Sequence, residues 1–155
     1  MKKAIRYLHR TAGVAAFLMI LTFFTSTLVV ELWGDQAGIL AVKNAIAMGV
    51  WVLVPLMIAA GGTGFKMVPN ARKGPLGNKK KRMHFIALNG LLVLLPSALY
   101  LDYQAGAGRF ETQFYLIQGT ELIAGLINLT LMGLNIRDGI RLTRAHNASS
   151  NLQAG

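Results

Sequence analysis

The chain has 155 residues, of which 54% are hydrophobic and only 14% are charged, and its formal net charge is +10. This balance is more apolar and less charged than that of a soluble domain, so it indicates a lipid environment. The cations gather in a few segments, which argues against a nucleic-acid partner, and the lack of cysteine excludes disulfides, thiolate metal sites and iron–sulfur clusters.

Four apolar stretches are long enough to cross the roughly 30 Å hydrocarbon core of a bilayer as helices. They are predicted at residues 11–33, 38–61, 84–101 and 114–136. The first follows basic residues, as a secretory signal does, but its length and the lack of an A-x-A site indicate a retained span. We therefore predict an all-α integral membrane protein, a four-helix bundle that forms a single domain over residues 1–145.

Basic residues mark three segments: the arm before the first span, the connection KMVPNARKGPLGNKKKR at 66–82, and the end of the fourth span at 137–144. These segments alternate with four spans so that all three face one side, which the positive-inside rule assigns to the cytoplasm. Both termini are thus predicted to be cytoplasmic, in a bacterial inner membrane. The connection is predicted as a flexible turn, and residues 146–155 as a flexible tail.

Polar residues within the second and fourth spans are the first candidates for a site, because they are costly in hydrocarbon unless they are paired. Lys43 and Asn44 lie at nearly the same depth as Gln118 and Glu121, counted at 1.5 Å per residue. Lys43 and Glu121 are therefore predicted to form a buried ion pair. These four residues are interpreted either as a polar pocket, such as a quinone headgroup site or proton path, or as a clamp that fixes the register of the second and fourth helices. Glu31 is expected to reach water.

Two prolines fall inside predicted spans, Pro55 in the second and Pro96 in the third. Each removes a backbone donor and is expected to bend its helix. The bends either open a cavity or leave irregular, packed helices. Glycine and alanine in the second and fourth spans predict close helix packing.

Two of the three histidines, His9 and His84, lie at the cytoplasmic ends of the first and third spans. Two imidazoles at one depth on parallel helices meet one requirement for holding a haem iron. Gly13, one turn after His9, would leave room for the macrocycle, and Asn135 or Asp138 is a candidate partner for a ring nitrogen. Side chains placed to receive the haem propionates are Arg6, Arg10, Lys81 and Arg82.

The segment RYLHRTAG at residues 6–13 resembles the L-H-R-x-x-G entry of small bacterial b561-like membrane cytochromes. That resemblance implies haem b bound by His9 and His84, and electron transfer with quinones or other carriers. The family commonly uses two pairs of histidines, whereas this chain places only these two near the membrane, so it implies at most one haem. The alternative without a cofactor is that both histidines are interfacial residues beside anionic lipid headgroups.

No motif of a hydrolase, zinc protease or kinase occurs, and the sequence leaves open whether the protein is an enzyme. Three function classes remain. The first is a haem- and quinone-linked electron-transfer protein, or an anchor for a membrane redox partner. The second is a cofactor-free accessory or scaffold subunit of a larger complex. The third is a small transporter or channel, which would require a homo-oligomer.

Overall fold

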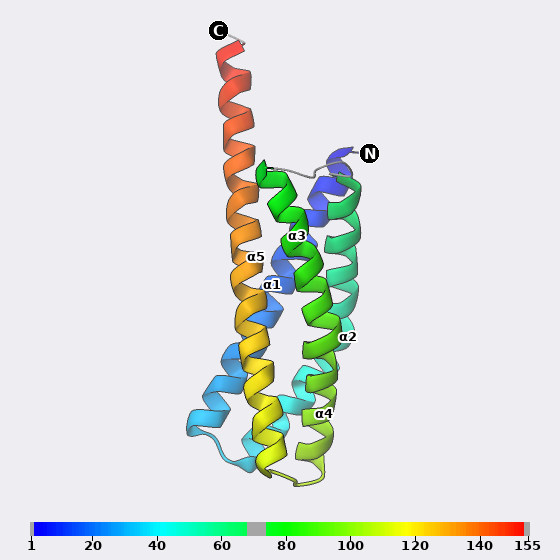
Figure 1. Cartoon of the computed structure of the whole chain (residues 1–155), viewed down its shortest axis with the longest axis vertical. Coiled ribbons are helices and arrows are strands. Elements are labelled where there is room, and N and C mark those ends of the chain that lie inside the picture. Colours follow the sequence, from blue (N-terminus) through cyan, green and yellow to red (C-terminus); the bar gives the residue numbers. More distant parts are fainter. Residues whose placement is uncertain (1, 68–73, 154–155) are drawn as a thin grey trace.

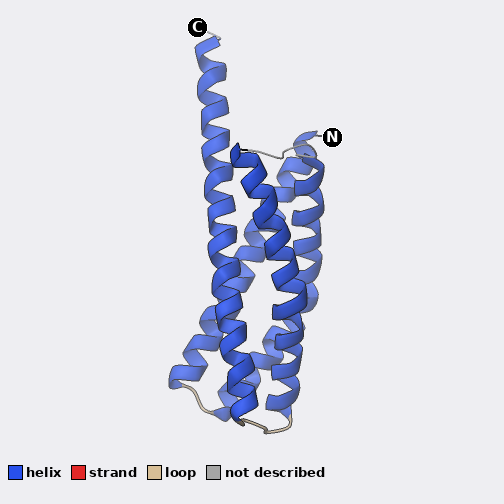
Figure 2. Cartoon of the chain, in the orientation of Figure 1, coloured by secondary structure: helices blue, strands red, loops and turns tan. Residues whose placement is uncertain are grey.

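The computed structural model describes residues 2–67 and 74–153, and every regular element in these two ranges is helical (Figure 2). The elements are α1 (Lys2–Trp33), α2 (Gln36–Met67), α3 (Gly74–Asn89), a π-helical turn η1 (Gly90–Leu94), α4 (Leu95–Gly106) and α5 (Thr112–Gln153). Because α3, η1 and α4 follow one another without a break, the chain forms four long rods (Figure 1). The prediction of an all-helical fold with four long helices is confirmed.

Four segments have the length and apolar composition needed to cross a membrane. They are Lys3–Trp33, Gln36–Met67, Lys80–Gly106 and Thr112–Arg141, and each contains one of the predicted spans in full. Large apolar side chains face outward along them, for example Trp51, Ile58 and Leu116, which are 74%, 69% and 67% exposed. An apolar surface of this kind suits contact with lipid tails, because lipid tails neither donate nor accept hydrogen bonds.

The helices extend beyond the spans into segments that the sequence predicts to be flexible. α2 continues to Met67 and α3 begins at Gly74, so most of the 66–82 connection is helical, and residues 68–73 lie outside the described part. Lysine and arginine have good helix propensity, and proline is tolerated in a first turn, as at Pro75. α5 likewise runs through the predicted tail to Gln153, because neither proline nor glycine interrupts it after Gly139.

The rods pack as an up-and-down bundle, with α1 crossing obliquely behind the others (Figure 1). α1 packs on α2 and α5, and both α2 and α5 pack on the α3–η1–α4 rod. The start of α1 and the end of α5 lie at one end of the bundle, which we call the terminal end (Figure 1). The α1–α2 and α4–α5 connections lie at the other, which we call the distal end.

The two distal connections are short and locally specified. Asp35 caps α2, because its Oδ1 accepts a hydrogen bond of 2.8 Å from the backbone N–H of Gly38. Gly108, between α4 and α5, has φ of +67°, a left-handed conformation that glycine adopts without steric cost. Beside it, Phe110 and Phe114 meet edge to face, with ring centroids 5.1 Å apart.

Close approach of α1 and α2 depends on Gly49. A Cβ atom at this position would overlap the ring of Phe23, so only glycine lets the ring approach the α2 backbone this closely. Phe23 in turn packs against the buried side chains of Ile46, Val50 and Ala98. This interface therefore agrees with the predicted use of small residues at helix contacts.

Candidate functional site

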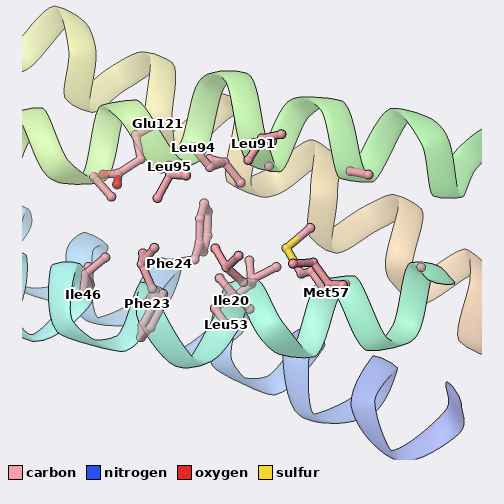
Figure 3. A pocket seen from close by; sticks show the side chains of 18 of the residues that line it. Ile20, Phe23, Phe24, Ile46, Leu53, Met57, Leu91, Leu94, Leu95 and Glu121 are labelled. Atoms are coloured by element: carbon pink, nitrogen blue, oxygen red, sulfur yellow. The ribbon is translucent and has the colours of Figure 1, made fainter. Parts of the chain in front are cut away.

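An elongated cavity of about 430 Å³ lies between α1, α2, the η1–α4 rod and α5 (Figure 3). It is partly open to the outer surface of the bundle, because the exposed side chains of Ile58 and Leu91 are among its lining residues. Along α2 its lining reaches from Ile46 to Phe65, a length of about 28 Å at 1.5 Å per residue. The lining is almost wholly apolar. Its large side chains include Ile20, Phe23, Phe24, Leu53, Met57 and Leu94.

The cavity has a structural cause in the third rod. The π-turn η1 supplies Gly90, Leu91 and Leu94 to its wall, and Pro96 follows in the first turn of α4. A proline cannot donate the usual helical hydrogen bond, and a π-turn is a common way for a helix to change its bonding register. Small residues on the facing helices then leave the space unfilled, among them Gly61, Gly62 and Gly125. The structure has both an irregular third rod and a cavity beside it, and neither Pro55 nor Pro96 lines that cavity.

The wall becomes polar toward the distal end of the cavity, where Glu121 and Thr27 line it. Figure 3 shows the Glu121 carboxylate near one end of the labelled side chains and Met57 toward the other. The Nζ atom of Lys43 donates to Oε2 of Glu121 at 2.7 Å, and the Lys43 side chain has no exposed surface. The structure thus brings together the two charged residues that the sequence predicts to pair.

Gln118 belongs to the same cluster. Its Nε2 donates to Oε2 of Glu121 at 3.2 Å, so that one oxygen receives both an ammonium and an amide donor. The Glu121 carboxylate is thus held by side chains from both α2 and α5. Asn44, expected beside this group, is instead exposed on the outer surface of α2, because it is the next residue after Lys43 and points about 100° around the helix.

Glu31 is partly exposed near the distal end of α1. Its carboxylate atom Oε1 is buried, and the charges of both Lys43 and Glu121 act on the side chain. Sequence position alone placed Glu31 near the end of the first span, within reach of water. The structure buries Oε1 of Glu31 while the residue as a whole stays partly exposed. Lys43, Gln118, Glu121 and Glu31 are called the polar cluster below.

A second polar contact, which the sequence does not single out, links the third rod to α5. Nδ2 of Asn89 donates to the Ala124 carbonyl and to Oδ1 of Asn128, both at 2.9 Å. Asn128 is fully buried and donates in turn to the Ile86 carbonyl at 3.4 Å. The signal available in the sequence was Asn89 in the third predicted span and Asn128 among the three amide residues of the fourth, without any indication that these two faced each other.

The two histidines lie at a similar level near the end of α2, since both contact its residues 60–65. The Nδ1 atom of His9 is 2.8 Å from the carbonyl oxygen of Ala60. In His84, Nδ1 donates to the Lys80 carbonyl at 3.0 Å, and the ring packs on Phe65 with centroids 4.6 Å apart. A proton held on Nδ1 by a carbonyl leaves Nε2 as the nitrogen that carries the lone pair.

The remaining residues predicted around a haem are spread over the terminal end. Arg6 and Arg10 are exposed, and there is open space beside Gly13. Arg82 binds Asp138 through Nη1 at 2.9 Å, with Oδ1 of Asn135 at 3.4 Å from the same atom. Asp138 and Asn135 therefore contact Arg82. Nδ1 of each histidine lies at a backbone carbonyl, and Nδ1 of His9 is also 3.4 Å from the Thr63 hydroxyl.

Comparison with protein-family models, with curated proteins and with solved structures finds no match to this chain. Among the described residues, no three histidine, aspartate or glutamate side chains gather as a potential metal site. Chemically, the bundle offers a long apolar chamber with a charged and hydrogen-bonding end.

Proposed function

We propose that this protein is a multi-pass protein of the bacterial inner membrane that binds a prenylated quinone and takes part in quinone-linked electron transfer. The observation that carries the proposal is the elongated apolar cavity that ends at the ion pair of Lys43 and Glu121. A prenylated quinone likewise consists of a long apolar part, its hydrocarbon tail, and a compact polar part, its head.

The shape and the apolar lining of the cavity suit the hydrocarbon tail of a prenylated quinone. Its lining is aliphatic and aromatic over about 28 Å of α2, and the large side chains leave a channel along the helices. Small-molecule sites are typically apolar with a few placed polar groups that fix orientation. A flexible isoprenoid chain would follow this channel.

The polar side chains at the distal end of the cavity suit the head of the quinone. Thr27 offers a hydroxyl that can donate or accept, and Glu121 offers a carboxylate. Intramembrane ionisable residues are costly, so their presence at the end of an apolar chamber favours a binding role. The clamp interpretation remains compatible, because the same ion pair joins α2 to α5.

Quinone binding can be tested by quenching the fluorescence of Trp33 and Trp51, the only two tryptophans, with a decyl-substituted benzoquinone in detergent. Gly61→Leu extends a side chain from the cavity wall and should weaken binding at least tenfold. Gly133→Leu is the matched control, because an added Cβ likewise meets nothing within 4 Å while Gly133 is not a lining residue. Equal affinities for both variants and the unmodified protein would contradict the proposal.

A second proposal is that His9 and His84 bind one haem b. The supporting observation is that a backbone carbonyl faces Nδ1 of each ring, as is usual for imidazoles that bind a metal through Nε2. The fit is incomplete, because neither histidine lines the cavity and the Met83 side chain packs between α3 and Gly64 beside His9.

The haem proposal predicts reduced-minus-oxidised absorption bands in the visible spectrum of the purified protein. His9→Ala and His84→Ala should each abolish them, since each removes an axial ligand. His146→Ala, in the predicted tail, is the control and should leave the bands intact. A folded, colourless protein isolated from haem-replete cells would argue against haem and would leave quinone binding untouched.

Orientation and lipid contact are part of the same proposal. Exposed cations lie near the terminal end, including Lys3, Arg6, Arg10 and Lys66. Cationic side chains at the cytoplasmic surface are attracted to anionic lipid headgroups. Both termini are therefore proposed to face the cytoplasm, which places the polar cluster toward the opposite side of the membrane.

A further inference from the structure

The polar cluster contains two buried oxygen acceptors that receive no hydrogen bond from any residue that the structure describes: Oε1 of Glu31 and Oε1 of Gln118. Gln118 is only 3% exposed, so water has little access to its amide. Its Nε2 is bonded to Glu121, which aims the whole amide into the cluster. Buried polar atoms nearly always have a partner, so two without one call for an explanation.

The donors of the cluster are already directed at Glu121. Lys43 and Gln118 both donate to Oε2 of that carboxylate. The Lys43 ammonium forms its described ion pair with Glu121, and its charge also acts on Glu31. A carbonyl oxygen added to this site would be one more acceptor, whereas a hydroxyl would supply a hydrogen atom that Oε1 of Glu31 or Oε1 of Gln118 can accept.

The unpaired acceptors lie next to the polar end of the cavity. Glu31 is one helical turn beyond Thr27 on α1, and Gln118 is one turn before Leu122 on α5, where Thr27 and Leu122 are both cavity-lining residues. Neither Glu31 nor Gln118 lines the cavity itself, so a head would meet their acceptors by extending past Thr27 and Glu121 toward the distal end.

We infer that the site selects a ligand whose polar end donates hydrogen bonds, and hence the reduced, dihydroxy form of the quinone (the quinol) over the oxidised form. The inference rests on the proposed quinone site and adds its preferred redox state. One quinol hydroxyl donates to Glu121, and the acceptors of Glu31 and Gln118 lie within the adjoining turn to receive the second hydroxyl. The oxidised ring has two carbonyl oxygens and no hydrogen to offer.

The test compares the affinities of the decyl hydroquinone and the decyl quinone under anaerobic conditions. The hydroquinone should bind at least tenfold more tightly to the unmodified protein. Its dimethyl ether, which keeps the ring and tail but has no hydroxyl hydrogen, should bind no better than the quinone. Equal affinity for hydroquinone and ether would overturn the inference.

Variants then assign the preference to the named oxygens. Gln118→Met and Glu31→Met remove one acceptor each and should reduce the hydroquinone preference, while affinity for the quinone stays within about threefold. Glu111→Gln is the control, because this carboxylate is exposed near the same end of α5. A preference that both methionine variants retain in full would overturn the inference.

The two proposals fail in different ways. If neither redox form binds, or if Gly61→Leu binds both as well as Gly133→Leu does, the quinone site itself is wrong. If both forms bind equally in the unmodified protein and Gly61→Leu weakens both, the quinone site stands and only the redox preference is wrong. Because the ratio is measured first in the unmodified protein, a variant that fails to fold does not prevent a decision.

Discussion

The Nζ atom of Lys43 and the Oε2 atom of Glu121 lie 2.7 Å apart between α2 and α5, and the lysine side chain is completely buried. Both residues stand in helices with the length and composition of membrane spans. The pair closes one end of the apolar cavity, so its integrity affects both the packing of the bundle and the proposed ligand site.

Removal of one member of this pair should be strongly destabilising. Lys43→Met leaves the Glu121 carboxylate buried without its cation, and we expect a loss of about 3 kcal/mol in the free energy of unfolding. The measurement is a denaturation titration in mixed detergent micelles. Lys43→Met combined with Glu121→Leu should recover most of the loss, because no buried charge then remains.

The control for that experiment is the second interhelical ion pair. Arg82 and Asp138 retain 23% and 17% side-chain exposure, so Arg82→Met should cost about 1 kcal/mol or less. Similar losses for Lys43→Met and Arg82→Met would show that burial does not distinguish the two pairs.

The amide contact between Asn89 and Asn128 should couple the third rod to α5. Asn128→Leu leaves Asn89 with one acceptor fewer, and Asn89→Leu leaves the buried Oδ1 of Asn128 without its donor. A double-mutant cycle should give a coupling energy of about 0.6 to 1.7 kcal/mol, the range found for interhelical polar contacts in membranes. Strictly additive losses would mean that the hydrogen bond does not contribute to stability.

Gly49 should tolerate no side chain. Gly49→Ala forces the new methyl group against the ring of Phe23, and we expect a loss of about 1 to 3 kcal/mol from overpacking, measured by thermal denaturation. Gly119→Ala is the matched substitution in α5, where an added Cβ meets nothing within 4 Å. It should be neutral or stabilise by up to about 1 kcal/mol, because alanine has the higher helix propensity. The opposite order would contradict the close approach of α1 and α2.

The proposed orientation predicts which surface positions share a side of the membrane. The chain has no cysteine, so single substitutions are labelled without background. Arg109→Cys should react with an impermeant maleimide in intact cells, because Arg109 is exposed in the distal connection. Lys3→Cys and Lys66→Cys should react only after permeabilisation, since both lie toward the terminal end. Labelling of Lys66→Cys and Arg109→Cys from one side would contradict the topology.

Local sequence determined the helical rods. Apolar composition sums along the chain, so a stretch of about 20 apolar residues marks a span wherever its partners lie, and each predicted span falls inside a candidate span of the structure. Depth along a span is also additive at 1.5 Å per residue, which is why Lys43 and Glu121 were predicted to meet. The helix ends were less predictable, because the basic connection and the tail have residues compatible with either helix or turn.

Only the tertiary structure decided how each helix is rotated and tilted about its neighbours. Asn44 points outward and Oε1 of Glu31 is buried because of those rotations, and a lipid-facing helix has too little polar contrast between its faces to reveal them. The pairing of Asn89 with Asn128, and the cavity between η1 and α2, likewise depend on residues far apart in the chain. The composition of a segment indicates whether lipid or water surrounds it. A binding site, in contrast, depends on how several segments are placed relative to one another.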